Sequence, residues 1–153
     1  RMKGYNFELI INDSEDNIRS YIKRNSIDIP ENITVHPRQN DVVEFYNRAT
    51  VVLNLSNRKL AIETFGLTAL EAMTAGLPVI VPTVGGIAEM IEDGLNGYKI
   101  DVQELDAIEE KLKEILKNKD LFIYLANNAR ECSKKYTAER MTGNIEHLIL
   151  NSF

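Results

Sequence analysis

Through residue 100, short apolar segments alternate with segments whose apolar residues recur at helical spacing. Strand–helix alternation with short connections is typical of a doubly wound parallel sheet with helices on both faces. We therefore predict a Rossmann-like three-layer α/β/α fold. Segment 50–55 shows little polar alternation, which favours a strand covered on both faces. The expected strands are residues 7–11, 33–35, 50–55, 78–81 and 97–100, and the expected helices between them are 14–25, 41–49, 66–75 and 87–93.

After residue 100 the chain is expected to be helical. Three stripes of apolar residues recur there at helical spacing and are interpreted as packing faces. No repeat, low-complexity tract or Pro/Gly-rich linker interrupts the sequence. We therefore treat residues 1–153 as one domain.

Composition argues against several classes of protein. The 153 residues hold 18 Lys and Arg against 23 Asp and Glu, a net charge of −5, without a basic stripe that interleaves aromatics, so no nucleic-acid partner is expected. No apolar run approaches the roughly 20 residues of a membrane-spanning helix. Cys132 has no second cysteine to pair with, so we expect a reduced, cytoplasmic setting.

One stretch after the third expected strand holds the residues best suited to chemistry. Glu63 lies in the loop at the carboxyl end of that strand, and Glu71 lies eight positions later, about two turns along, in the next helix. Ligands of doubly wound sheets bind outside these strand ends, so both carboxylates can border one crevice. Residues 65–67 would form the first helical turn, whose free N–H groups attract an anion such as phosphate. Two carboxylates around an anion site suit a ligand with a diphosphate between two diols, which is the shape of a nucleotide sugar.

Two glutamates eight positions apart also occur by chance, and Glu71 alone would be interpreted as a solvated helix residue. Five blocks around them change this interpretation. They are the E-x7-E pair, F-G-L at 65–67, E-A-M-x-x-G-x-P-V-I at 71–80, G-G-x-x-E at 85–89 and D-G-x-N-G at 93–97. Together they resemble the signature of the GT4 family of retaining glycosyltransferases. That family has the GT-B fold of two facing Rossmann-like domains, and the signature belongs to the second, donor-binding domain.

The resemblance implies roles for individual residues. Glu63 would be the catalytic-site glutamate that binds hydroxyls of the donor sugar, and Glu71 would bind the ribose hydroxyls. The base would be held by the turn after the second strand, which includes Arg38 and departs from the usual apolar-Gly pattern of the family. Contacts to sugar hydroxyls and phosphate would come from Phe65, Gly66, Leu67 and Thr68.

Other residues keep two interpretations. Gly85 and Gly86 either form a second anion nest or permit a tight turn. Arg58 and Lys59 either reach the donor phosphates or are exposed loop cations. The remaining glycines of the blocks are expected to be caps and turns, and these are Gly76, Gly94 and Gly97.

The resemblance also implies parts that this sequence lacks. GT4 proteins are more than twice as long, so the N-terminal acceptor domain is not included. The donor domain of the family opens with a strand and helix that bring an Arg and a Lys to the diphosphate, and these have no counterpart here. We therefore expect weak donor binding and no activity from the fragment alone. Any membrane contact would come from the missing domain.

The reaction implied is transfer of a sugar from a nucleoside-diphosphate sugar to a glycan, lipid or small-molecule acceptor, with retention of configuration. No D-x-D occurs, and no metal or other cofactor is expected, because the helix N-terminus and cations would stabilise the leaving diphosphate. Two alternatives stay open. One is another GT-B enzyme, such as a nucleotide-sugar 2-epimerase, and the other is a non-catalytic GT-B-like binding module. The sequence does not name the base, sugar or acceptor.

Overall fold

A computed structural model describes residues 2–57, 59–60 and 62–150, without the side chains at 141, 144, 145, 148 and 149. The chain divides into two compact units, Arg1–Glu44 and Phe45–Phe153. Each unit is described separately below. No helix in the described ranges is both long and apolar enough to cross a membrane.

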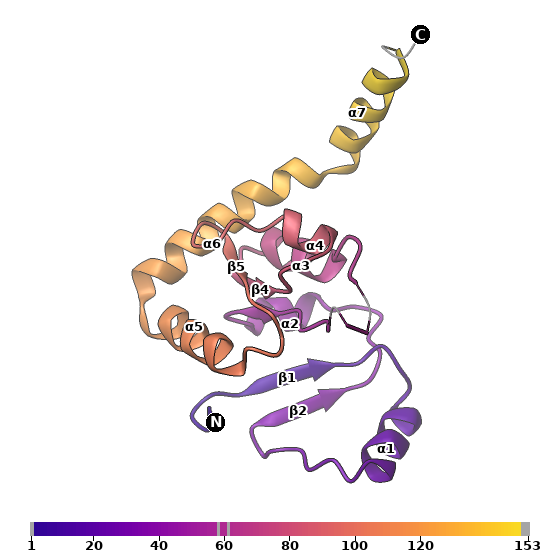
Figure 1. The fold of residues 1–153 in the computed structure, drawn as a ribbon, viewed down its shortest axis with the longest axis vertical. Coiled ribbons are helices and arrows are strands. Elements are labelled where there is room, and N and C mark those ends of the chain that lie inside the picture. Colours follow the sequence, from indigo (N-terminus) through magenta and orange to yellow (C-terminus); the bar gives the residue numbers. More distant parts are fainter. Residues whose placement is uncertain (1, 58, 61, 151–153) are drawn as a thin grey trace. The chain divides into compact units, whose positions relative to one another are not determined.

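Unit 1 is a strand–helix–strand motif (Figure 1). Strands β1 (Phe7–Ile10) and β2 (Ile33–His36) pair in parallel, and α1 (Glu15–Arg24) connects them. Ser14 begins α1 as its N-cap, and its hydroxyl accepts the backbone N–H of Asn17 at 3.3 Å. Acidic residues in the first turn and basic residues in the last turn oppose the helix dipole. The strands and the helix confirm the prediction for this segment.

Unit 2 contains a three-stranded parallel sheet in the order β3-β4-β5. Helix α2 begins at Val43, just before the unit, and six further helical segments connect the strands or follow the sheet in the described residues. The elements are α2 (Val43–Arg48), β3 (Val52–Leu53), α3 (Leu67–Thr74), β4 (Val79–Val81), α4 (Gly86–Glu89), β5 (Gly97–Lys99), α5 (Leu105–Lys117), α6 (Lys119–Ser133), η1 (Lys134–Tyr136) and α7 (Ala138–Leu150).

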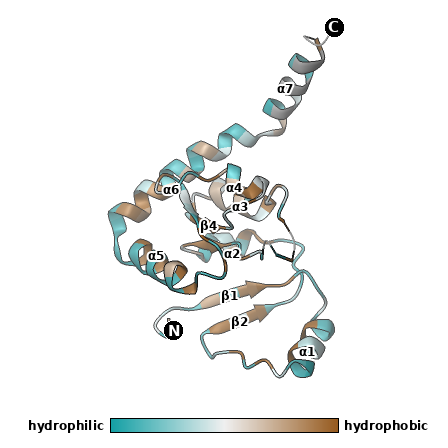
Figure 2. Cartoon of the chain, in the orientation of Figure 1, coloured by the Kyte–Doolittle hydropathy of each residue, from teal (hydrophilic) through white to brown (hydrophobic). Residues whose placement is uncertain are grey.

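The core of unit 2 lies around β4, α3 and α6. All three β4 residues are at most 1% exposed, as are Met73 of α3 and Ala129 of α6. Each fully buried Val, Ile or Met contributes roughly 1.5–3 kcal/mol relative to an exposed one. In Figure 2, α5 and α6 alternate between hydrophobic and hydrophilic colours, as expected of helices that cover a core with one face. The α/β architecture is therefore confirmed by packing as well as by element order.

The strand covered on both faces is β4, not segment 50–55. In that segment only Val52 and Leu53 are in a strand, and both are half-buried. The reason is topological, because β4 has a strand partner on each side while β3 pairs with β4 alone among the described residues. The five predicted strands are present and all their pairings are parallel, but they form two sheets instead of one continuous sheet.

Helix α4 is shorter than the predicted segment 87–93, and Asn96 explains why. Its side chain is buried, donates to the carbonyl of Met90 at 2.9 Å and accepts the N–H of Glu92 at 2.9 Å. These bonds hold residues 90–92 in a turn that replaces further helix. Gly94 within the same turn has a φ of +76°, which confirms its predicted turn role.

Candidate functional site

The loop that holds Glu63 lies directly against the start of α4. A Cβ added to Gly86 would be 1.8 Å from the carbonyl oxygen of Thr64, and one added to Gly85 would be 2.3 Å from that of Glu63. Gly85 also has a φ of +97°. No side chain fits at either position, so the two glycines allow two backbone segments to touch. The structure thus gives this pair a packing role, and a phosphate contact by either glycine stays a prediction.

The N-cap of α3 is Gly66, which is buried. The residue has φ +77° and ψ +58°, and a Cβ added there would be 2.4 Å from Cγ1 of Ile87. No side chain caps the helix. Among the described residues, the N–H groups of Leu67 and Thr68 have no hydrogen-bond acceptor, as expected in a first turn. The first turn of α3 therefore keeps these two N–H groups without an acceptor in the described chain, and anion binding by them stays a prediction.

The two large apolar residues of this turn point away from the core. Phe65 is 44% exposed and Leu67 is 63% exposed, whereas Ala69, one position after Thr68, is 1% exposed. The apolar side chains next to the open turn are therefore available to a ligand or to another part of the protein.

Thr68 and Glu71 lie three positions apart on α3 and so share one exposed face. Side chains from α2 and from the segment after β3 hydrogen-bond to this face. Tyr46 of α2 donates its hydroxyl to Oε2 of Glu71 at 2.8 Å and also lies 3.3 Å from the carbonyl oxygen of Thr68. Asn54, after β3, donates its side-chain amide to Oγ1 of Thr68 at 3.3 Å. Burial raises the pKa of Tyr46, and the hydrogen bond and charge of Glu71 raise it further.

Tyr46 and Asn54 are the residues that sequence reasoning missed as members of this face. Tyr46 lies at helical spacing within the predicted helix 41–49, a pattern that indicates packing, and its ring does pack against the core of unit 2. The partner of its hydroxyl lies 25 positions later in the chain, so no local spacing could indicate it.

The remaining predicted site residues are placed as follows. Glu63 is half-buried, and its carboxylate has no hydrogen bond within the described part of the chain. Lys59 donates to the side chain of Gln103 at 3.1 Å. Arg38 belongs to unit 1, where its Nε donates to Oδ1 of Asn12 at 2.7 Å. Arg58 lies outside the described residues. The structure thus brings the residues of segment 63–71 together with Gly85 and Gly86, and it ties Lys59 and Arg38 to other partners.

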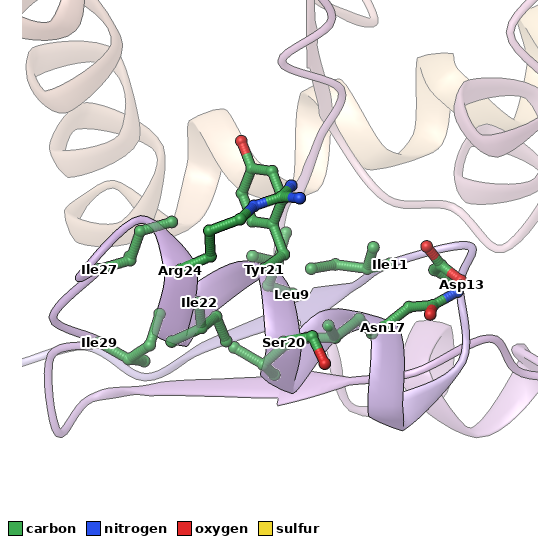
Figure 3. A pocket seen from close by; sticks show the side chains of 12 residues that line it. Leu9, Ile11, Asp13, Asn17, Ser20, Tyr21, Ile22, Arg24, Ile27 and Ile29 are labelled. Atoms are coloured by element: carbon green, nitrogen blue, oxygen red, sulfur yellow. Dashed lines mark hydrogen bonds between the residues drawn. The ribbon is translucent and has the colours of Figure 1, made fainter.

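Unit 1 holds a cavity of about 600 Å³, lined mostly by apolar residues of α1, β1 and the segment before β2 (Figure 3). The polar residues that line it are Asp13, Asn17, Ser20 and Arg24, and the side-chain amide of Asn17 donates to Oδ1 of Asp13 at 2.7 Å. This bond, with the N–H of Ser14, lowers the pKa of Asp13. None of the predicted site residues lines the cavity, which offers apolar contact and little chemistry.

In the described ranges, no three His, Cys, Asp or Glu side chains are grouped so that they could hold a metal ion.

Comparisons with known proteins agree with this geometry. The family model described as Glycosyl transferases group 1 matches residues 1–132. The N-acetyl-alpha-D-glucosaminyl L-malate synthase of Bacillus anthracis is 30% identical over 122 residues, which cover 79% of this chain and 31% of that protein.

Two solved structures share the fold. The C-terminal domain of a glycosyl transferase group 1 family protein from Francisella tularensis is 25% identical, with a TM-score of 0.60 over 79% of this chain and 60% of that one. Anabaena HepE, solved in complex with UDP-glucose, is 22% identical, with a TM-score of 0.71 over 90% of this chain and 36% of that one. This chain spans less than two thirds of each of these three proteins.

Proposed function

The chain belongs to the glycosyl transferases group 1 family, and from this membership we propose that it is the donor-binding domain of a retaining glycosyltransferase. The whole protein would transfer a sugar from a nucleoside-diphosphate sugar to a glycan, lipid or small-molecule acceptor. One observation carries the proposal. The N-terminus of α3, with the exposed Glu71 about one turn further on, offers N–H groups suited to an anion and a hydroxyl acceptor on the same helix.

Each part of the donor has a matching group. The N–H groups of Leu67 and Thr68, at the positive end of α3, would bind the diphosphate. Gly66, buried against Ile87, gives the left-handed backbone turn from which α3 and these N–H groups start. The carboxylate of Glu71 would accept the ribose hydroxyls, and that of Glu63, with no hydrogen-bond partner in the described chain, would accept hydroxyls of the sugar. Phe65 would cover the sugar with its exposed ring.

In the proposed mechanism the protein stabilises the leaving nucleoside diphosphate. Negative charge builds on the diphosphate as its bond to the sugar breaks. The N-terminus of a helix, equivalent to roughly half a positive charge, stabilises that charge best when it is already aimed at the phosphate. Gly85 and Gly86 contribute by holding the loop of Glu63 against α4, so that the sugar-binding carboxylate keeps its position while the bond breaks. The proposal requires no metal or other cofactor.

The acceptor domain and the opening strand of the donor domain would come from other parts of the protein. In unit 1, β1 pairs with β2 among the described residues, and its second edge would pair with that opening strand. Cations that complete the diphosphate site would come from the same missing part. We place the donor in the cytoplasm, with any membrane contact made by the acceptor domain.

Nucleotide binding tests the proposal. We would titrate the complete protein that carries this chain with UDP, GDP, ADP and dTDP and follow the ligand signals by NMR. UDP belongs in the panel because a structural relative was solved with UDP-glucose. We expect one preferred nucleotide, and we expect Glu71→Ala to weaken it about tenfold or more, because hydrogen bonds to a charged group contribute roughly 1.5–3 kcal/mol.

Glu110→Ala is the matched control, since Glu110 is an exposed glutamate on α5, away from the E-x7-E segment. Absence of binding by every nucleotide would contradict the donor-site proposal and favour the non-catalytic module. Binding with equal affinity in the Glu71→Ala variant would contradict the role of Glu71. Hydrolysis or transfer assays with the matching nucleotide sugar then separate a transferase from a 2-epimerase by their products.

A further inference from the structure

We infer that Tyr46 is a positioning residue that orients the carboxylate of Glu71 toward the ribose hydroxyls of the donor. Neither the signature blocks nor the comparisons assign a role to this residue. The inference rests on the proposed function, because it needs Glu71 to bind ribose.

The Tyr46 hydroxyl has two possible acceptors, and the distances favour the carboxylate of Glu71. The Tyr46 oxygen lies 2.8 Å from Oε2 of Glu71 and 3.3 Å from the carbonyl oxygen of Thr68. A phenol has one proton to donate, and the shorter distance to a charged acceptor gives the stronger bond. Tyr46 itself is held in place, since its ring is half-buried against the core of unit 2. The Tyr46 hydroxyl is therefore a fixed donor to one oxygen of Glu71, whose exposed side chain could otherwise rotate.

The consequence for Glu71 is a carboxylate with a defined direction. Oε1 has no hydrogen-bond partner in the described part of the chain, so it is the oxygen that remains for a ligand. Without Tyr46 the exposed glutamate would sample several staggered rotamers and would lose that freedom only on binding. Prior ordering of the side chain raises affinity for a ligand that needs the ordered state.

Removal of the Tyr46 hydroxyl also has an effect that would raise affinity for ribose, but this effect is smaller than the loss of order. It frees a lone pair on Oε2 of Glu71, which could accept a ribose hydroxyl. A carboxylate oxygen has two lone-pair sites, however, so Tyr46 leaves one site of Oε2 open already. The loss of order therefore exceeds the gain of an acceptor, and affinity for a ribose diol should fall when the hydroxyl is removed.

Tyr46→Phe tests the inference, because it keeps the ring and removes only the hydroxyl. In the complete protein we would compare dissociation constants for UDP, GDP and ADP with those for dUDP, dGDP and dADP. The ratio of deoxy to ribo constants measures recognition of the 2′-hydroxyl. Tyr136→Phe is the matched control, since Tyr136 packs against the same core and its hydroxyl makes no hydrogen bond within the described residues.

We expect Tyr46→Phe to lower the deoxy-to-ribo ratio about threefold to tenfold, the effect of one hydrogen bond. We expect Tyr136→Phe to leave it unchanged, and Glu71→Ala to abolish the preference. In the Glu71→Ala background, Tyr46→Phe should have no further effect, because Tyr46 acts through Glu71.

The inference would be overturned if Tyr46→Phe left the ratio unchanged, for example by weakening ribonucleotides and deoxyribonucleotides equally. The donor site would still be supported in that case if Glu71→Ala abolished the preference for ribose. A ribo preference that survives Glu71→Ala would instead overturn the proposed role of Glu71, and the inference with it. Urea midpoints of the variants distinguish a lost contact from a protein that has failed to fold.

Discussion

Gly86→Ala gives the sharpest test of how the Glu63 loop is held. The added Cβ would lie 1.8 Å from the carbonyl oxygen of Thr64, whereas ordinary contact begins at 3.4 Å. The two backbone segments would therefore have to separate by about 1.6 Å. Backbone shifts forced by an extra methyl group cost roughly 1–3 kcal/mol. We expect the upper part of that range, because the atom in the way belongs to the main chain and cannot rotate aside.

Alanine substitutions at two other glycines distinguish a steric clash from a backbone conformational penalty as the cause of lost stability. Gly94 has a φ of +76° with nothing within 4 Å of an added Cβ, so Gly94→Ala measures the conformational penalty alone, roughly 1–2 kcal/mol. Gly143 in α7 has neither a positive φ nor a near neighbour. Gly143→Ala should therefore stabilise the protein by roughly 0.5–1 kcal/mol, as alanine does within a helix.

The assays are urea unfolding followed by circular dichroism and nucleotide titration of each variant. Gly86→Ala should lower both the urea midpoint and the affinity for the nucleotide sugar, because the shifted loop displaces Glu63. Gly94→Ala should lower the midpoint without changing affinity. If Gly86→Ala destabilised the protein no more than Gly94→Ala and bound the donor normally, the close backbone packing at the G-G block would be refuted.

Further predictions follow from single contacts. Asn96→Ala should cost about 2 kcal/mol or more in urea unfolding, since it leaves two backbone groups of a buried turn without partners. Arg130→Ala should cost about 0.5–1.5 kcal/mol, because its guanidinium donates to the carbonyl of Ala75 at the end of α3. Burial and Glu71 raise the pKa of Tyr46, so the native state keeps a proton that the unfolded chain releases, and stability falls as pH rises above about 10. Tyr46→Phe should lessen that fall in urea midpoints measured across alkaline pH.

The sequence predicted the elements that local patterns encode. The start of α1 next to Ser14, the turns at Gly76 and Gly94, and the start of α3 next to Gly66 all follow from spacing and residue type, and the structure confirms them. Gly97 has a different reason from the one expected. An added Cβ there would lie 2.4 Å from the carbonyl oxygen of Val79, so close packing of β5 on β4 requires it.

Contacts between distant segments were beyond local patterns. The reach of Tyr46 to Glu71 depends on how α2 lies on α3, and the contact of Gly86 with Thr64 depends on how two loops meet. The residue spacing within each segment does not indicate either contact. The same holds for the burial of β4 in place of residues 50–55, since burial follows from the strand order and the apolar content of the two segments is similar.

The signature blocks therefore combine two kinds of residue that differ in their physical effect. Gly86 and Asn96 are needed by the fold, and their substitution should lower stability first. Glu71 is exposed and contacts Tyr46, so its carboxylate contributes little to the fold, and Glu71→Ala should cost less than about 1 kcal/mol of stability. Loss of nucleotide affinity without loss of stability is then the mark of a binding residue. If Glu71→Ala instead destabilised the protein as much as Asn96→Ala does, the E-x7-E pair would be structural here, and the non-catalytic module would become the better account of this chain.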